Sequence, residues 1–442
     1  MKNLSRAAKF ITLTNLIYQF GQGLASVFIN IYLLRQLHSL DQLVLFNLIQ
    51  FPAILAGYLE SNLIEKEIKA KYYVQLGMFI QILAYFLIIF LKNNVSGFVF
   101  PLGFVFGLAT GVYFAGMNVL TYLNTRNDNR DTFYGFGSSL SNFLSMGTPL
   151  ISGFIISQTL IPRMGIVENY YLLFFLSSLI LFVGIIFSFL LPSSKVPKVR
   201  PKELISPLKK KLWRYTSYAY IIEGLKVGSE GFITSYLVFN ILSKELNIGI
   251  YQSLFSVINA IFCMLLAKRM NKGNRMKSIL IGSLMTLFSN ILYISIFSVS
   301  GLILNSIIGI IAGPLYSIGT SSAFFNALDN NREHKKDFNK YIVFLEFPMM
   351  AGRSLGALLF LIFLGFGKPL VIAKMWFLFI GLVPLIFSLF IYKFTELSKG
   401  NEQSLFGKYI YLYIYLPLPE VIKIPTRKTK KLIEYSFAFF SS

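Results

Sequence analysis

Residues 72–91 read YYVQLGMFIQILAYFLIIFL, a segment without a charged side chain. A helix needs about 20 mainly apolar residues to cross the ~30 Å hydrocarbon core of a bilayer, so this segment predicts a transmembrane helix. Runs of the same kind recur along the whole chain. We place twelve of them, near residues 10–33, 43–60, 72–91, 98–122, 133–158, 169–192, 216–241, 249–267, 278–298, 301–325, 341–365 and 371–393.

The composition agrees with a polytopic membrane protein and excludes most other classes. Of the 442 residues, 55% are hydrophobic and 14% are charged, which is not typical of soluble domains. The net charge of +22 arises from Lys and Arg clusters between apolar runs, so we expect no nucleic-acid partner. The single cysteine, Cys263, and two histidines offer little for a disulfide framework or a metal site, and we expect no metal and no cofactor.

The basic residues are distributed unevenly between the two sides of the membrane. Most of the 41 Lys and Arg residues precede the first run, follow the last run or lie in every second connection. The other connections hold few, among them Arg35, Lys92 and Lys244. Because basic loops resist translocation, this asymmetry predicts that both termini are cytoplasmic. We expect the plasma membrane as the location.

The longest internal connection, residues 193–215, divides the chain into two halves. It contains Pro197, Pro201 and Pro207 among basic residues, which predicts a flexible cytoplasmic linker. The predicted units are a six-helix half at 1–192, this linker, a second six-helix half at 216–393 and a basic cytoplasmic tail at 394–442. The tail alternates Tyr with Ile and Leu, and we leave open whether it lies at the membrane interface or is disordered.

Comparing the chain with itself supports a duplication. A displacement of 208 residues superposes polar positions of the first and seventh spans: Asn15 on Glu223, Tyr18 on Lys226, Gln22 on Glu230 and Gly23 on Gly231. A displacement of 202 relates the ends of the fourth and tenth spans: Gly111 to Gly313, Asn124 to Asn326, Asn129 to Asn331 and Arg130 to Arg332. Two registers that differ by a few loop residues indicate a duplicated six-helix unit.

Twelve spans in two parallel halves joined by a basic loop resemble the major facilitator superfamily of secondary transporters, over about residues 8–395. After the second span, Gly57, Leu59 and Lys66 match the superfamily motif G-x-L-x-D-R-x-G-R-K, whereas Ser61 and Asn62 replace its Asp and Arg. Gly147, Pro149 and Gly153 in the fifth span resemble the glycine-proline motif of the drug:proton antiporters. The resemblance implies alternating access, with the first, fourth, seventh and tenth spans around the substrate path.

Five ionisable residues lie inside predicted spans, where a charge costs about 2.5–3.5 kcal/mol on insertion scales. Glu223, Lys226 and Glu230 are spaced by three and four residues, so they share one face of the seventh span. Glu346 and Arg353, seven residues apart, share a face of the eleventh. Two interpretations stay open: an internal ion-pair network that locks helices together, or groups that line a solute pathway.

The acidic members of this set are candidates for proton coupling. Burial raises the pKa of a carboxyl group and a neighbouring cation lowers it, so alternating solvation of Glu223 or Glu230 could load and release a proton. The proton gradient would then be the driving force. All five groups together carry a net charge of −1 when ionised, which favours a cationic or neutral solute, although the two basic groups could also clamp a carboxylate or phosphate.

Polar residues in the other central spans complete the predicted pathway. Its members are Asn15, Tyr18, Gln22, Tyr113, Asn118, Glu223, Lys226, Glu230, Tyr316 and Asn326. Such residues either line a water-filled cavity or form hydrogen bonds between helices. We assign interface or gating roles to Glu346 and Arg353, and to Arg130 and Arg332 in cytoplasmic loops, where ordinary solvation is the alternative.

The sequence therefore predicts an all-α secondary transporter that moves a small solute by alternating access, coupled to protons, with efflux of a drug or metabolite by antiport as one form. Alternatives are a symporter or uniporter for a sugar or organic ion, and a non-transporting scaffold or receptor. We do not expect a nucleotide-driven pump, because the sequence contains no G-x-x-x-x-G-K-[ST] phosphate-binding loop. His38 and His334 fall on opposite sides, so we expect no enzyme. The expected partners are the solute and the lipid bilayer, and we expect a monomer.

Overall fold

The computed structural model describes residues 5–37, 39–63, 68–125, 130–157, 165–196, 199, 201–267, 275–329 and 337–398. These residues are almost entirely helical. The long helices are α1 (Arg6–Leu37), α2 (Leu40–Leu63), α3 (Ala70–Leu91), α4 (Val99–Asn124), α5 (Arg130–Ile156), α6 (Ile166–Ser188), α7 (Lys211–Leu242), α8 (Glu245–Ala267), α9 (Arg275–Ser295), α10 (Val299–Asp329), α12 (Phe338–Leu364) and α13 (Pro369–Ser398).

Each predicted apolar run coincides with one of these helices, and the all-α, polytopic membrane architecture is confirmed. Ten helices of the described chain are long and apolar enough to cross a bilayer. Helix α7 is not among them. Charged residues interrupt the apolar sequence of α7, and these include the stripe at residues 223, 226 and 230. The weakest hydrophobic signal thus belongs to the helix that carries the candidate chemistry.

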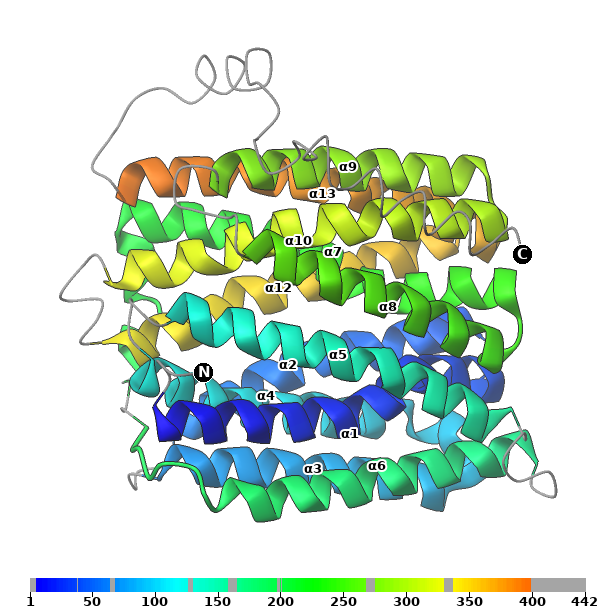
Figure 1. Ribbon diagram of the computed structural model, residues 1–442, viewed down its shortest axis with the longest axis horizontal. Helices are drawn as coiled ribbons and strands as arrows, with labels where there is room; N and C mark the ends of the chain where they lie inside the picture. The colour runs from blue at the N-terminus through cyan, green and yellow to red at the C-terminus, as the bar shows by residue number, and fades with distance from the viewer. Residues whose placement is uncertain are drawn as a thin grey trace, which may run out of the picture.

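The helices run side by side along the long axis of the molecule, with α1 to α6 below and α7 to α13 above in Figure 1. Among the first six, α1 packs on α5 and α6, α4 packs on α2 and α3, and α3 packs on α6. Among the last six, α7 packs on α12 and α13, α10 packs on α8 and α9, and α9 packs on α13. The pairings repeat in the same order, as a duplicated six-helix unit requires.

Four pairs of helices carry most of the contact between the first six and the last six. These are α5 with α8, α2 with α12, and α7 with both α1 and α2. In Figure 1, α5 and α8 lie next to each other across the middle of the molecule. We call the end at which α1 and α7 begin the basic end, and the end at which α8 begins the opposite end.

Part of the connection between α6 and α7 packs against the helices at the basic end. Val199 and Leu204 are buried in one cluster with Val343 of α12. The Ala70 amide donates a hydrogen bond to the Ser194 carbonyl, 2.8 Å away. The prolines of this connection predict a flexible linker, whereas these parts of it pack against the helices. Of the predicted tail, α13 takes up the first residues as far as Ser398, and residues 399–442 lie outside the described chain.

Candidate functional site

The charged stripe of α7 meets α10 in the second half of the bundle. The Lys226 ammonium lies 3.4 Å from Oε2 of Glu230, an ion pair between neighbouring turns of one helix. From α10, the Tyr316 hydroxyl donates a hydrogen bond of 2.5 Å to Oε2 of Glu223. The Lys226 ammonium also lies 5.4 Å from the centroid of the Tyr316 ring, in range of a cation–π interaction. We call Glu223, Lys226, Glu230 and Tyr316 the charged cluster.

One side of the charged cluster is open. The Glu230 side chain is 44% exposed, whereas that of Lys226 is 15% exposed. A Cβ atom built on Gly313, one turn before Tyr316 on α10, meets nothing within 4 Å. The cluster is therefore partly accessible at Glu230, with open space on the neighbouring part of α10.

A close helix crossing brings α12 to the other side of α7. A Cβ atom added to Gly224 of α7 would lie 2.8 Å from the Cα atom of Gly352, closer than packed atoms can approach. Only a residue without a side chain fits there, so the crossing places Arg353 beside α7. Arg353 is in turn 3.6 Å from Oε2 of Glu346 on its own helix. The two charges predicted in the eleventh span thus neutralise each other.

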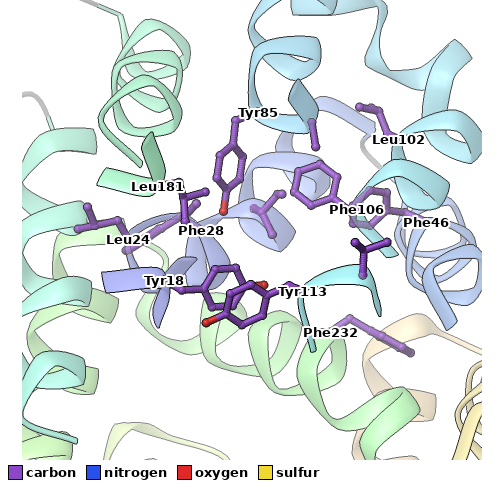
Figure 2. Close-up of a cluster of buried hydrophobic side chains, with 14 of the residues drawn as sticks. Tyr18, Leu24, Phe28, Phe46, Tyr85, Leu102, Phe106, Tyr113, Leu181 and Phe232 are labelled. Atoms are coloured by element: carbon purple, nitrogen blue, oxygen red, sulfur yellow. The ribbon is translucent and has the colours of Figure 1, made fainter. Parts of the chain in front are cut away.

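A second polar group, the tyrosine cluster, forms between α1, α3 and α4. The rings of Tyr18 and Tyr113 stack with centroids 3.5 Å apart, and Figure 2 shows them face to face. The Tyr113 hydroxyl donates to Oδ1 of Asn15 at 3.1 Å. The Gln22 amide lies 3.0 Å both from the Tyr18 hydroxyl and from Oε1 of Gln81. The structure thus brings together four predicted pathway residues and adds Gln81.

Tyr58 of α2 lies between these groups. Its hydroxyl accepts a hydrogen bond of 2.8 Å from the Asn118 amide. Helix α2, which carries Tyr58, packs on α4 of the first six helices and on α12 of the last six. Sequence reasoning missed Tyr58 because the second span is not among those expected around the substrate path.

Some predicted residues cannot be placed. The backbone of α10 includes Asn326 and that of α5 includes Arg130, but neither side chain belongs to the described structure. Arg332 also lies outside the described residues. The repeat superposes Tyr18 on Lys226 and thereby predicts that the two residues face each other across one cavity. Helices α1 and α7 touch directly, as that prediction requires, and the facing of the two side chains stays a prediction.

The opposite end holds an ion pair that sequence reasoning missed. Nε of Arg35, in the last turn of α1, lies 2.6 Å from Oε1 of Glu245, in the first turn of α8. Glu245 is 6% exposed, and Tyr170 of α6 donates a hydrogen bond of 3.0 Å to the same oxygen. The Arg35 guanidinium carbon lies 5.4 Å from the Phe239 ring of α7. The sequence feature that could have revealed this pair is a basic and an acidic residue in two short connections that are predicted to lie on the same side of the membrane.

At the basic end, a contact between aromatic rings joins the two groups of helices. The rings of Tyr122, near the end of α4, and Phe338, the first residue of α12, stack with centroids 4.1 Å apart. The first six and the last six helices are therefore in contact both at the basic end and at the opposite end of the bundle.

Comparisons with known proteins agree with this architecture. The uncharacterized protein YqgE of Bacillus subtilis (strain 168) is 27% identical over 363 residues, 81% of this chain and 83% of that protein. The crystal structure of the nucleoside transporter NupG superposes with a TM-score of 0.64 at 11% identity, covering 88% of this chain and 99% of that one. The human organic anion transporter MFSD10 (TETRAN) gives 0.60 at 14% identity, covering 87% and 99%.

At these identities, the structural likeness shows the fold alone, and the two solved transporters carry different solutes by name. The evidence for the family comes from the sequence. The family model described as Major Facilitator Superfamily matches residues 11–334, most of the chain. The chain belongs to the Major Facilitator Superfamily and is a multi-pass membrane transporter.

Proposed function

We propose that the protein moves a small solute by alternating access and couples this movement to protons through Glu223 or Glu230. The observation that carries the proposal is the charged cluster, with two carboxylates on one face of α7, of which Glu230 is 44% exposed. Ionisable groups inside membrane-spanning helices are costly, and they are typical of proton and solute pathways. We propose that the other predicted pathway residues line the path once the helices move apart, since Tyr18 and Tyr113 are buried against each other here.

Each carboxylate of the cluster has a partner on which its protonation would depend. Glu230 is paired with the Lys226 ammonium, and Glu223 accepts a hydrogen bond from Tyr316. In general, a carboxylate that loses a cationic partner or a donor in an apolar environment takes up a proton. Because Tyr316 is on a different helix from Glu223, a displacement of α10 against α7 would change the partners of the acid. Helix movement and proton binding would thus be coupled.

Alternating access requires that the contacts at the two ends break in turn. The Arg35–Glu245 pair would hold the opposite end closed, and the Tyr122–Phe338 stack would hold the basic end closed. We propose that the basic end is cytoplasmic, because it carries the connections rich in Lys and Arg. The location would be the plasma membrane, with efflux by antiport as one form of the reaction.

The test begins with the solute. Cells lacking the gene are compared with cells that overproduce the protein in a screen of metabolites and drugs, and solutes that differ are then measured in proteoliposomes containing the full chain. We expect accumulation against a concentration gradient when a pH gradient is imposed, and loss of accumulation when an ionophore dissipates it. Equilibration that ignores the pH gradient would indicate uniport. The absence of flux for every solute would favour a scaffold or receptor.

A further inference from the structure

The surroundings of the Lys226 ammonium have the chemistry of a cation-binding site. One carboxylate, Glu230, lies 3.4 Å away, and a second, Glu223, lies one turn earlier on the same face of α7, where Tyr316 donates a hydrogen bond to it. The Tyr316 ring provides an aromatic face at 5.4 Å. Carboxylates combined with an aromatic face are the groups by which proteins recognise ligand cations. Lys226 thus occupies a position where the same carboxylates and aromatic ring would also bind a free ammonium ion.

The carboxylate of this site is accessible. Glu230 is 44% exposed and more open than Lys226, so a solute would meet the carboxylate before the lysine. Gly313 lies one turn before Tyr316 on α10, and a Cβ atom built there meets nothing within 4 Å. The site therefore has open space beside Gly313 as well as at Glu230.

The charge of the site selects the class of solute. The charged cluster has two carboxylates and one ammonium, and the neighbouring Arg353 is paired with Glu346, which adds no net charge. An anion that approaches the cluster would meet the exposed Glu230 carboxylate and be repelled. A cation can exchange with Lys226 for the same partners, without leaving a carboxylate unpaired.

We propose that Lys226 is a tethered occupant of a cation site and that a primary-amine solute binds there by displacing it. The inference rests on the proposed function, because it takes α7 and α10 to line the solute path. It also gives a physical reason for a lysine inside a membrane protein. Two carboxylates in a membrane-spanning helix would be costly without a cation, so the lysine returns whenever the solute leaves.

The site can be tested by rescuing a variant with a small amine. In Lys226→Ala, the tethered ammonium is gone. n-Butylammonium has the length of the lysine side chain from Cβ to Nζ, one methylene more than the part that alanine lacks. We expect the purified full-length variant to melt at a lower temperature than the unaltered protein and to regain stability saturably with n-butylammonium. Butyrate, which has the same chain length and the opposite charge, should have no such effect.

The unaltered protein should respond to the same amine only at higher concentration. If Lys226 occupies the site at least about nine-tenths of the time, the apparent affinity for the free amine falls about tenfold or more relative to Lys226→Ala. The double variant Lys226→Ala with Glu230→Gln should lose the response, since the carboxylate partner is removed. Lys340→Ala, which breaks another lysine–acid pair on α12, is the matched control and should not respond.

Lys226→Met is a second variant in case Lys226→Ala fails to fold, because methionine keeps most of the length of the lysine side chain and removes the charge. It should be stabilised by methylammonium, which needs less room than n-butylammonium. The inference is overturned if neither variant responds to an amine, if butyrate acts equally well, or if the response survives Glu230→Gln. Amine binding without any flux would instead refute the transport proposal. Flux of an uncharged or anionic solute with no amine binding would refute only this inference.

Discussion

Nε of Arg35 lies 2.6 Å from Oε1 of Glu245, and this ion pair joins the end of α1 to the start of α8. Residues from opposite halves of the sequence thus meet at the end of the bundle where few basic residues lie. The Glu245 carboxylate is buried and accepts a second hydrogen bond from Tyr170. Removal of Arg35 would therefore leave a buried acid with only a neutral partner.

We expect Arg35→Ala to open this end of the protein. The pair is intermediate between exposed and buried, because about one third of the Arg35 side chain is accessible, so its loss should cost about 2 kcal/mol. The measurement is the rate at which an impermeant maleimide modifies Gly231→Cys in a Cys263→Ser background. Labelling should be faster with Arg35→Ala and unchanged with Lys340→Ala. Equal rates in all three proteins would show that the pair is not a gate.

The proposed orientation can be read in intact cells. Cysteines introduced at Ser96 and Lys244, both exposed at the opposite end, should react with an impermeant reagent added outside. Cysteines introduced at Lys202 and Asp337, exposed at the basic end, should react only after the cells are permeabilised. Reactivity with the two pairs interchanged would reverse the orientation.

Most of the fold could be predicted, because a bilayer demands a run of about 20 apolar residues and each such run can be read without knowledge of its neighbours. The charged stripe was predictable for a similar reason, since spacings of three and four place residues on one helical face. The partners of these residues depend on how helices rotate and cross. Tyr58, Gln81 and the Arg35–Glu245 pair were missed because each acts through a helix distant in sequence.

The crossing of α7 and α12 gives a paired test of packing. Gly224→Ala places a Cβ atom 2.8 Å from the Cα of Gly352, and overpacking of this kind costs about 1–3 kcal/mol. Gly231→Ala, seven residues along the same helix, enters open space and should be neutral or stabilising, by up to ~1 kcal/mol from helix propensity. Thermal unfolding in detergent compares them. Equal melting temperatures would argue against the close crossing.

Coupling can be separated from transport by glutamine substitutions, because glutamine resembles a permanently protonated glutamate. When the carboxylate that carries the proton is replaced by glutamine, the variant should still exchange solute across a proteoliposome membrane. It should not accumulate the solute in response to a pH gradient. We expect this of Glu223→Gln or Glu230→Gln, and expect Lys226→Ala to impair transport by removing their cationic partner. If both glutamine variants, singly and together, retain gradient-driven accumulation, the stripe is a structural ion pair and Glu346 is the next candidate.

Alternating access itself can be measured without knowledge of the solute, from distances between spin labels in the full chain in lipid nanodiscs. One label pair, at Ser96 and Lys244, reports on the opposite end, and a second, at Leu123 and Asp337, reports across the Tyr122–Phe338 contact at the basic end. Double electron–electron resonance is recorded for each pair at acidic and basic pH, and again with Arg35→Ala. The account predicts that the two distances change in opposite senses, one lengthening as the other shortens. Distances that stay fixed under every condition, or that lengthen together, would contradict it.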